Sequence, residues 1–254
     1  MRGNNYHVQM VVSLTPMVKA LLIANAVIWL AAVVIVQGFI TKNTLFFNLF
    51  GLSPKHFVES LSLWQPFTYM FLHSSSVWHL LFNGLIVWFI GSELEKIWGP
   101  REFLKYYLVC GVGAGLLFVA VIYAAVGFFG LDPRFLNVPT IGASGAVFGL
   151  LVAYGVLFAE REIYFMMLFP MKAKHFILIL AGVEFFTLLT SGFGGAVNNT
   201  AHLGGFVVGL IYLYTKKYFH RVQQAKWLKK PGRNLKLVVD NDPKSKKDKG
   251  PTYH

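Results

Sequence analysis

Long apolar runs are the feature that most constrains the fold of this chain. A helix that crosses the hydrocarbon core of a bilayer needs roughly 20 predominantly apolar residues. Six stretches approach this length, at residues 17–40, 77–93, 103–129, 140–158, 175–190 and 201–219. Inside a bilayer the backbone polar groups must be satisfied within the chain, so each stretch is predicted to be a helix. The sequence therefore predicts an all-α, polytopic membrane protein with a bundle of six transmembrane helices.

The composition excludes an ordinary water-soluble domain. Charged residues make up 13% of the chain, whereas a soluble domain has about 25%. The one cysteine, Cys110, lies in the third apolar run and is interpreted as a buried hydrophobic side chain. His73 and His79 have no third ligand near them in the sequence, so no metal site and no cofactor are expected.

Positive charge is concentrated at the C-terminal end. Residues 216–254 hold 12 of the 23 Lys and Arg and three acids, a net +9 out of +12 for the chain. We interpret 1–16 as an N-terminal cytoplasmic segment, 17–219 as the membrane domain and 220–254 as a basic, disordered cytoplasmic tail. Such a tail is expected to contact anionic lipid headgroups, and the charge requires no nucleic-acid partner.

The loops agree with this orientation. Basic residues favour the cytoplasmic side, and the two loops assigned to that side carry Lys96, Arg101, Arg161, Lys172 and Lys174. The loops assigned to the outer side are longer in total, yet they carry only Lys42, Lys55 and Arg134. Both termini are therefore predicted to be cytoplasmic, and the second, fourth and sixth spans to begin at the outer face.

Polar residues recur near the outer ends of these three spans. His79 and Asn83 lie on the second, Ser144 on the fourth and His202 on the sixth, so all four are predicted to lie at a similar depth. A serine hydroxyl becomes a nucleophile when an adjacent base removes its proton, and histidine is the usual base. The pattern predicts Ser144 as nucleophile and His202 as general base.

Glycines explain how the serine and the histidine could meet. Gly145 and Gly149 form one GxxxG pattern and Gly205 and Gly209 another, and small residues four apart let membrane helices approach closely. Gly142 leaves room for a substrate carbonyl beside the start of the helix.

Donors for a developing oxyanion are also present in the sequence. His79 and Asn83 lie on one helical face and can donate hydrogen bonds to it together with the free N–H groups at the helix start near Ser144. No acid near the outer face is evident to orient His202, so the expected site is a Ser-His dyad. Glu184 lies mid-span, with either a functional or a packing role.

Each of these features has a plainer interpretation when taken alone. Ser144 is then a small packing residue, His202 a helix-end histidine, and the glycines ordinary contacts. A transporter or channel would be expected to show internal repeats and a midplane site, which the sequence does not display. The aromatic loop at 41–76 is either an interfacial structural element or a wall that guides a substrate.

These motifs resemble those of the rhomboid family of intramembrane serine proteases, over residues 17 to about 219. The resemblance rests on His79-Leu-Leu-Phe-Asn83, Gly142-Ala-Ser144-Gly145, His202-Leu-Gly204-Gly205 and Glu95-x3-Gly99. It implies a six-helix bundle with a cavity open to the outside and an oxyanion hole of His79, Asn83 and the Ser144 N–H. It also implies that loop 191–200 caps the site and that the second and fifth spans form a lateral gate.

Two positions depart from the family pattern. Trp64-Gln65 replaces a Trp-Arg pair that ties the outer loop in many relatives, and Phe148 replaces a tyrosine beside the base. Phe148 is still expected to pack on His202. The implied function is cleavage of transmembrane segments of other membrane proteins. Because the sequence shows no eukaryotic targeting segment, a bacterial inner membrane is the expected location. A silent rhomboid-like protein that binds membrane proteins without cutting them is the alternative.

Overall fold

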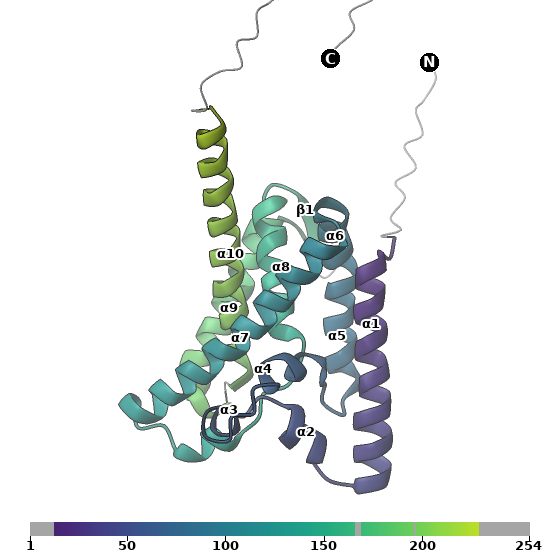
Figure 1. Ribbon diagram of the computed structural model, residues 1–254, viewed down its shortest axis with the longest axis vertical. Coiled ribbons are helices and arrows are strands. Elements are labelled where there is room, and N and C mark those ends of the chain that lie inside the picture. Colours follow the sequence, from purple (N-terminus) through teal and green to yellow (C-terminus); the bar gives the residue numbers. More distant parts are fainter. Residues whose placement is uncertain (1–12, 166–168, 196, 229–254) are drawn as a thin grey trace, which may run out of the picture. The chain divides into compact units, whose positions relative to one another are not determined.

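The computed structural model describes residues 13–165, 169–195 and 197–228. The chain forms two compact units, Met1–Thr215 and Lys216–His254. The long helical elements are α1 (Pro16–Ile28) with its wider continuation η1 (Trp29–Thr41), α5 (Val77–Ile86) continued by η3 (Val87–Gly91) and α6 (Ser92–Trp98), α7 (Pro100–Phe129), α8 (Ser144–Leu157), α9 (Ala173–Gly195) and α10 (Val197–Leu228) (Figure 1). Short helical elements are α2 (Leu45–Phe50), α3 (Pro54–Glu59), α4 (Gln65–Thr68), η2 (Tyr69–Phe71) and η4 (Pro133–Asn137).

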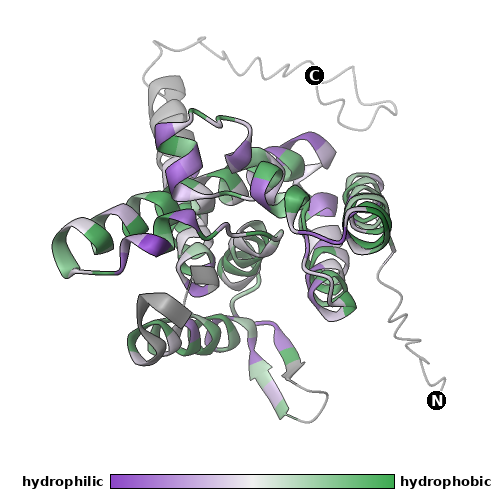
Figure 2. Cartoon of the chain, turned by 90° about the horizontal axis from the view of Figure 1, so that it is seen from below, coloured by the Kyte–Doolittle hydropathy of each residue, from purple (hydrophilic) through white to green (hydrophobic). Residues whose placement is uncertain are grey.

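The predicted all-α membrane fold is confirmed. In the part of the chain that the structure describes, four helical segments are long and apolar enough to cross a bilayer, namely Pro16–Thr41, Val77–Trp98, Pro100–Phe129 and Ala173–Thr190, and α8 is a shorter apolar helix. Large apolar side chains lie on the surface, with Phe39 73% exposed and Phe128 85% exposed, and hydrophobic residues dominate the helices in Figure 2. Such a surface suits contact with lipid and not with water.

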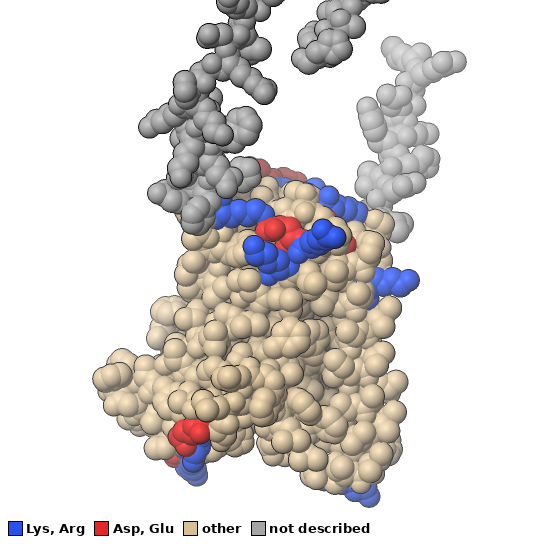
Figure 3. Space-filling view, in the orientation of Figure 1, with Lys and Arg blue, Asp and Glu red and all other residues tan. Residues whose placement is uncertain are grey.

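Charged side chains gather toward the two ends of the face drawn in Figure 3. Near the helix ends that meet the loop 159–174, Arg161 pairs with Glu93, and Glu160 pairs with both Lys172 and Lys174. These exposed pairs contribute little to stability individually. Their residues lie at a polar end of the helices, apart from the exposed apolar side chains.

Several predicted boundaries are wrong. The expected loop at 191–200 is helical in its described residues, because α9 continues to Gly195 and α10 begins at Val197. Glycine is tolerated in membrane helices because neighbouring helices, Ser and Thr side chains and local adjustments of the helix satisfy the backbone groups that it frees. The fourth predicted span, 140–158, starts too early, because the helix α8 begins at Ser144 and not at residue 140.

Two further segments also differ from the expectation. Residues 159–174 contain an antiparallel hairpin of β1 (Glu162–Phe165) and β2 (Phe169–Lys172), with Ile163 opposite Met171. Residues 220–228, predicted to be disordered, continue α10, because extending an existing helix avoids the cost of nucleation. Residues 229–254 of the predicted tail, and 1–12 of the predicted N-terminal segment, lie outside the described residues.

A buried carboxylate ties α1 to α6. Glu95 is 3% exposed and accepts hydrogen bonds from the Thr15 hydroxyl, from Met17 N at 3.0 Å and from Val18 N at 2.9 Å. These donors lie at the first turn of α1, where backbone N–H groups lack intrahelical acceptors and the helix dipole favours an anion. The Glu95-x3-Gly99 motif therefore fixes the start of the first span.

The segment between η1 and α5 is a compact structure held by a glutamine. Gln65 is 1% exposed. Its Oε1 accepts from Ser53 N at 3.2 Å, and its Nε2 donates to the carbonyls of Asn48 and Leu49 at 3.4 Å each. Trp64 Nε1 donates to the same Leu49 carbonyl at 2.9 Å. Gln65 thus ties together three parts of this segment through hydrogen bonds to its backbone.

Candidate active site

Ser144 is the first residue of α8, and the segment before it is held by the segment between η1 and α5. Leu52 and Thr140 exchange two backbone hydrogen bonds of 3.0 Å, and Gly142 N donates to the carbonyl of Tyr69 at 2.9 Å. The hydroxyl therefore lies where the first-turn N–H groups of a helix have no intrahelical acceptors. This is also the end at which the helix dipole favours negative charge.

Gly142 lies between Ser144 and His79. Its φ is +122°, a conformation that residues with a side chain rarely adopt. A Cβ at this position would lie 2.8 Å from Nε2 of His79 and 3.6 Å from Oγ of Ser144. The absence of a side chain at Gly142 therefore leaves an opening that both polar groups border.

The hydrogen bonds of His79 determine which ring nitrogen carries its proton. The Ser74 backbone N–H donates to Nδ1 at 3.3 Å, and the Ser74 hydroxyl lies 3.2 Å from the same atom. Because a backbone N–H can only donate, Nδ1 must present its lone pair and the proton belongs on Nε2. The atom that faces Gly142 is thus an N–H donor.

Asn83 follows His79 by one helical turn on α5. Its Nδ2 donates to the carbonyl of His79 at 2.9 Å, which uses one of its two amide hydrogens. The side chain is 7% exposed. One amide N–H of Asn83 is therefore left for a ligand.

Backbone contact between α8 and α10 brings the serine and histidine segments together. A Cβ on Gly205 would overlap the carbonyl of Gly145, and one on Gly209 would lie 3.2 Å from Cα of Gly149. A Cβ on Gly145, the residue after Ser144, would lie 3.6 Å from the carbonyl oxygen of Ala201. The two GxxxG patterns thus meet each other, as the sequence indicates.

Phe148 holds the ring of His202. The two rings are stacked, with centroids 4.6 Å apart and planes 12° from parallel. Phe148 lies on α8, one turn after Ser144, so the serine and the support of the histidine belong to the same helix.

Sequence reasoning was wrong about a carboxylate near His202. Oε1 of Glu184, on α9, lies 3.2 Å from Nδ1 of His202. This is an ion-pair distance, although the N–H direction does not meet hydrogen-bond geometry. Asn199 Nδ2 donates to the other oxygen, Oε2, at 2.7 Å. An acid within a membrane span was the available signal, but its helical face could not be read from the sequence.

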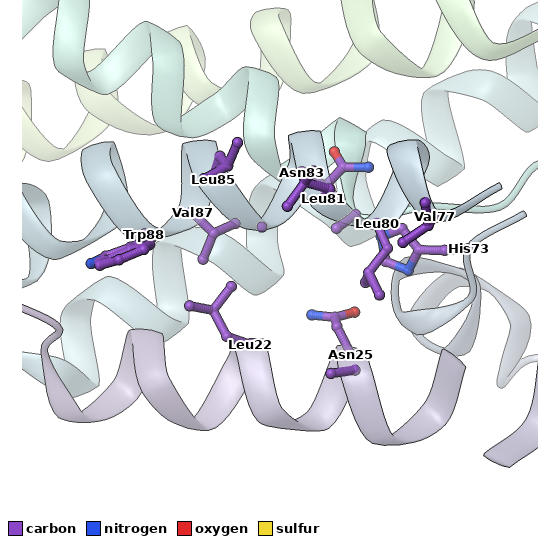
Figure 4. A pocket seen from close by; sticks show the side chains of 13 residues that line it. Leu22, Asn25, His73, Val77, Leu80, Leu81, Asn83, Leu85, Val87 and Trp88 are labelled. Carbon is purple, nitrogen blue, oxygen red and sulfur yellow. The ribbon is translucent and has the colours of Figure 1, made fainter. Parts of the chain in front are cut away.

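These side chains surround one cavity of about 340 Å³. Its lining consists of His79, Phe82, Asn83, Ile86, Ser144, Val147, Phe148 and His202. Asn83 also lines a neighbouring cavity of about 310 Å³ between α1 and α5. In Figure 4, Leu22 and Asn25 point from α1 toward α5, whereas Asn83 points away from α1.

His73 lines this neighbouring cavity and precedes α5. Its side chain is fully buried, and its ring lies edge-on to that of His79 with centroids 5.1 Å apart. Burial, followed by the proximity of His79, lowers the pKa of His73 to about 4. His73 is therefore a neutral neighbour of His79 near pH 7.

The fold and the cavity define a helical integral membrane protein with a serine, two histidines and an asparagine around one internal site. Residues 60–219 match the family model of the Rhomboid domain. The chain therefore belongs to the rhomboid family.

Three relatives illustrate the similarity. Rhomboid protein 1, mitochondrial, of Saccharomyces cerevisiae is 30% identical over 59% of this chain and 41% of its own length. Rhomboid protease GlpG of Pectobacterium atrosepticum is 29% identical over 63% of this chain and 51% of its own length. Rhomboid protease GluP of Bacillus subtilis is 28% identical over 66% of this chain and 29% of its own length. The matches therefore cover about half or less of each relative's length.

Proposed function

We propose that this protein is an intramembrane serine endopeptidase in which Ser144 is the nucleophile and His202 the general base. The observation that carries the proposal is that Ser144, His202, His79 and Asn83 line one cavity at the start of α8. The names of relatives such as GlpG and GluP, both described as rhomboid proteases, support the same reaction class.

The chemistry begins with attack of Ser144 Oγ on a peptide carbonyl while His202 takes the hydroxyl proton. Negative charge then develops on the carbonyl oxygen. Three donors are available for it: Nε2–H of His79, the remaining amide N–H of Asn83 and the backbone N–H of Ser144. His202 passes its proton to the leaving amine, and a water molecule, activated by the same base, hydrolyses the acyl-enzyme. No cofactor or metal ion is required by these steps.

The substrates are transmembrane segments of other membrane proteins. A carbonyl inside a helix is hidden by its own hydrogen bond, so the segment must unwind before Ser144 can reach it. Substrates with small or helix-breaking residues near the cut are therefore favoured. The surrounding bilayer is the second partner of the protein, through its apolar surface.

The orientation belongs to the same proposal. The loop charges support a cytoplasmic location of both termini, with the start of α8 toward the outer side. A bacterial inner membrane is the proposed location, with the basic residues after 215 against anionic headgroups.

The decisive experiment is covalent labelling of the purified protein with a fluorophosphonate probe. Wild type is expected to react, and Ser144→Ala and His202→Ala are expected not to react, while all three remain folded. Asn83→Ala should react about 100-fold more slowly, as expected for loss of one oxyanion donor. Ser60→Ala, at an exposed position, serves as the matched control and should label like wild type.

Cleavage of a model transmembrane substrate in liposomes then tests the reaction itself. Equal labelling of wild type and Ser144→Ala would show that the nucleophile is assigned incorrectly. A folded wild type that neither labels nor cleaves would favour the alternative, a rhomboid-like protein that binds membrane proteins without cutting them.

A further inference from the structure

Glu184 and Asn199 form a bridge between α9 and α10 behind the imidazole of His202. Oε2 of Glu184 accepts from Asn199 Nδ2 at 2.7 Å, and Oε1 lies 3.2 Å from His202 Nδ1. Asn199 and His202 are three residues apart on α10, so they project from one face of that helix. One carboxylate thus contacts both side chains.

Among the residues that the structure describes, the remaining surroundings of the imidazole ring contain little else that could orient it. Phe148 covers one face of the ring, and Nδ1 is shielded from solvent. The helix α8 contains no charged residue, and the one titratable residue of α5 is His79. On α9 the other titratable groups, Lys174 and His175, lie in the first turn, far along the helix from Glu184. Glu184 is therefore the acid available to Nδ1.

A carboxylate at this place has a defined chemical effect. It favours the tautomer of His202 with the proton on Nδ1, which leaves the lone pair on Nε2 to accept the proton of Ser144. It also stabilises the imidazolium that forms when that proton arrives. The hydrogen bond from Asn199 keeps the carboxylate in position, since it occupies the oxygen that does not face the ring.

We propose that Glu184, held by Asn199, is a positioning residue that acts through its charge on Nδ1 of His202, while Ser144 and His202 carry out the chemistry. This inference rests on the proposed protease function. It assigns a task to an acid whose burial among apolar helices otherwise has an energetic cost.

The test compares Glu184→Gln, Glu184→Asp and Asn199→Ala with wild type, using cleavage in liposomes and fluorophosphonate labelling. Glu184→Gln keeps the shape and removes the charge, and it should lower kcat on the order of 100-fold with little change in KM. Glu184→Asp should recover part of the rate because it restores the charge. Glu160→Gln, an exposed acid outside the site, is the matched control and should behave like wild type.

A double-variant cycle tests the part played by Asn199. Asn199→Ala should slow labelling about 10-fold, and adding it to Glu184→Gln should cause no further loss, because it acts through the same carboxylate. Multiplicative losses would overturn this arrangement. Should Glu184→Gln not fold, an unchanged rate in Asn199→Ala would overturn the proposal.

A spectroscopic measurement separates positioning from a general structural role. In protein with ¹⁵N-labelled histidine, His202 should show a protonated Nδ1 in wild type, and its tautomer populations should change in Glu184→Gln. If wild type reacts and Glu184→Gln reacts equally, the positioning role of Glu184 is wrong and the protease proposal stands. If folded wild type does not react with the probe or cleave the substrate, both proposals fail.

Discussion

The imidazole ring of His202 lies flat against the phenyl ring of Phe148, with centroids 4.6 Å apart and planes 12° from parallel. The two residues belong to α10 and α8, so the stack fixes the histidine relative to the helix that begins at Ser144. A stacked aromatic pair contributes about 0.5–1.5 kcal/mol beyond the area that it buries. The contact is therefore strong enough to affect the placement of the proposed base.

Replacing the ring should misplace the base without removing it. Phe148→Leu is expected to lower kcat about 2- to 10-fold, which corresponds to the energy of a stacked pair. Phe148→Tyr keeps the ring and should stay close to the wild-type rate. Cleavage kinetics in liposomes measure both. A Leu variant as fast as wild type would show that the stack does not position His202.

A side chain at Gly142 should close the site. Gly142→Ala forces an unfavourable φ of +122° and places Cβ 2.8 Å from Nε2 of His79. We expect labelling of Ser144 to fall more than about 100-fold, because both the oxyanion donor and the approach of the carbonyl are disturbed.

Gly127→Ala is the matched control for this variant. Gly127 lies within α7, and a Cβ there would meet no atom within 4 Å. It should label like wild type and be stabilised slightly, since alanine is the better helix former. If both variants label normally, Gly142 is not part of the site.

Glu95 should matter for stability and not for chemistry. Glu95→Ala removes the acceptor of three donors at the start of α1, and leaving such donors unpaired costs about 1–3 kcal/mol. The denaturation midpoint should fall accordingly, while folded protein should still label. Glu59→Ala, at an exposed position of α3, should leave the midpoint unchanged. An unchanged midpoint for Glu95→Ala would contradict the capping role.

The spans and the polar positions could be predicted from the sequence because both depend on local pattern. Apolar length defines where a helix can cross a bilayer, and the place of Ser144 or His202 within its span gives an approximate depth. The glycines at 145, 149, 205 and 209 added a reason for the helices carrying them to touch.

The contact between Glu184 and His202 could not be predicted in the same way. Sequence position gives the place of a residue along a helix, whereas this contact depends on how far α9 is rotated about its own axis. Packing against α8 and α10 sets that rotation, and α9 presents apolar residues on all sides. Similarly, a hydrophobic pattern did not show that Gly195 still belongs to α9.

His73 should make the stability of the protein depend on pH. Burial lowers the pKa of His73 from 6.5 to about 4, so between these values the unfolded chain binds a proton that the native protein does not. The contribution of His73 to the free energy of unfolding is therefore largest above pH 6.5. It falls by up to about 3 kcal/mol as the pH falls toward 4. Thermal unfolding across this range measures the slope. His73→Gln should flatten it, whereas His56→Gln, at a partly exposed position of α3, should not. Equal slopes in wild type and His73→Gln would show that another group controls the pH response.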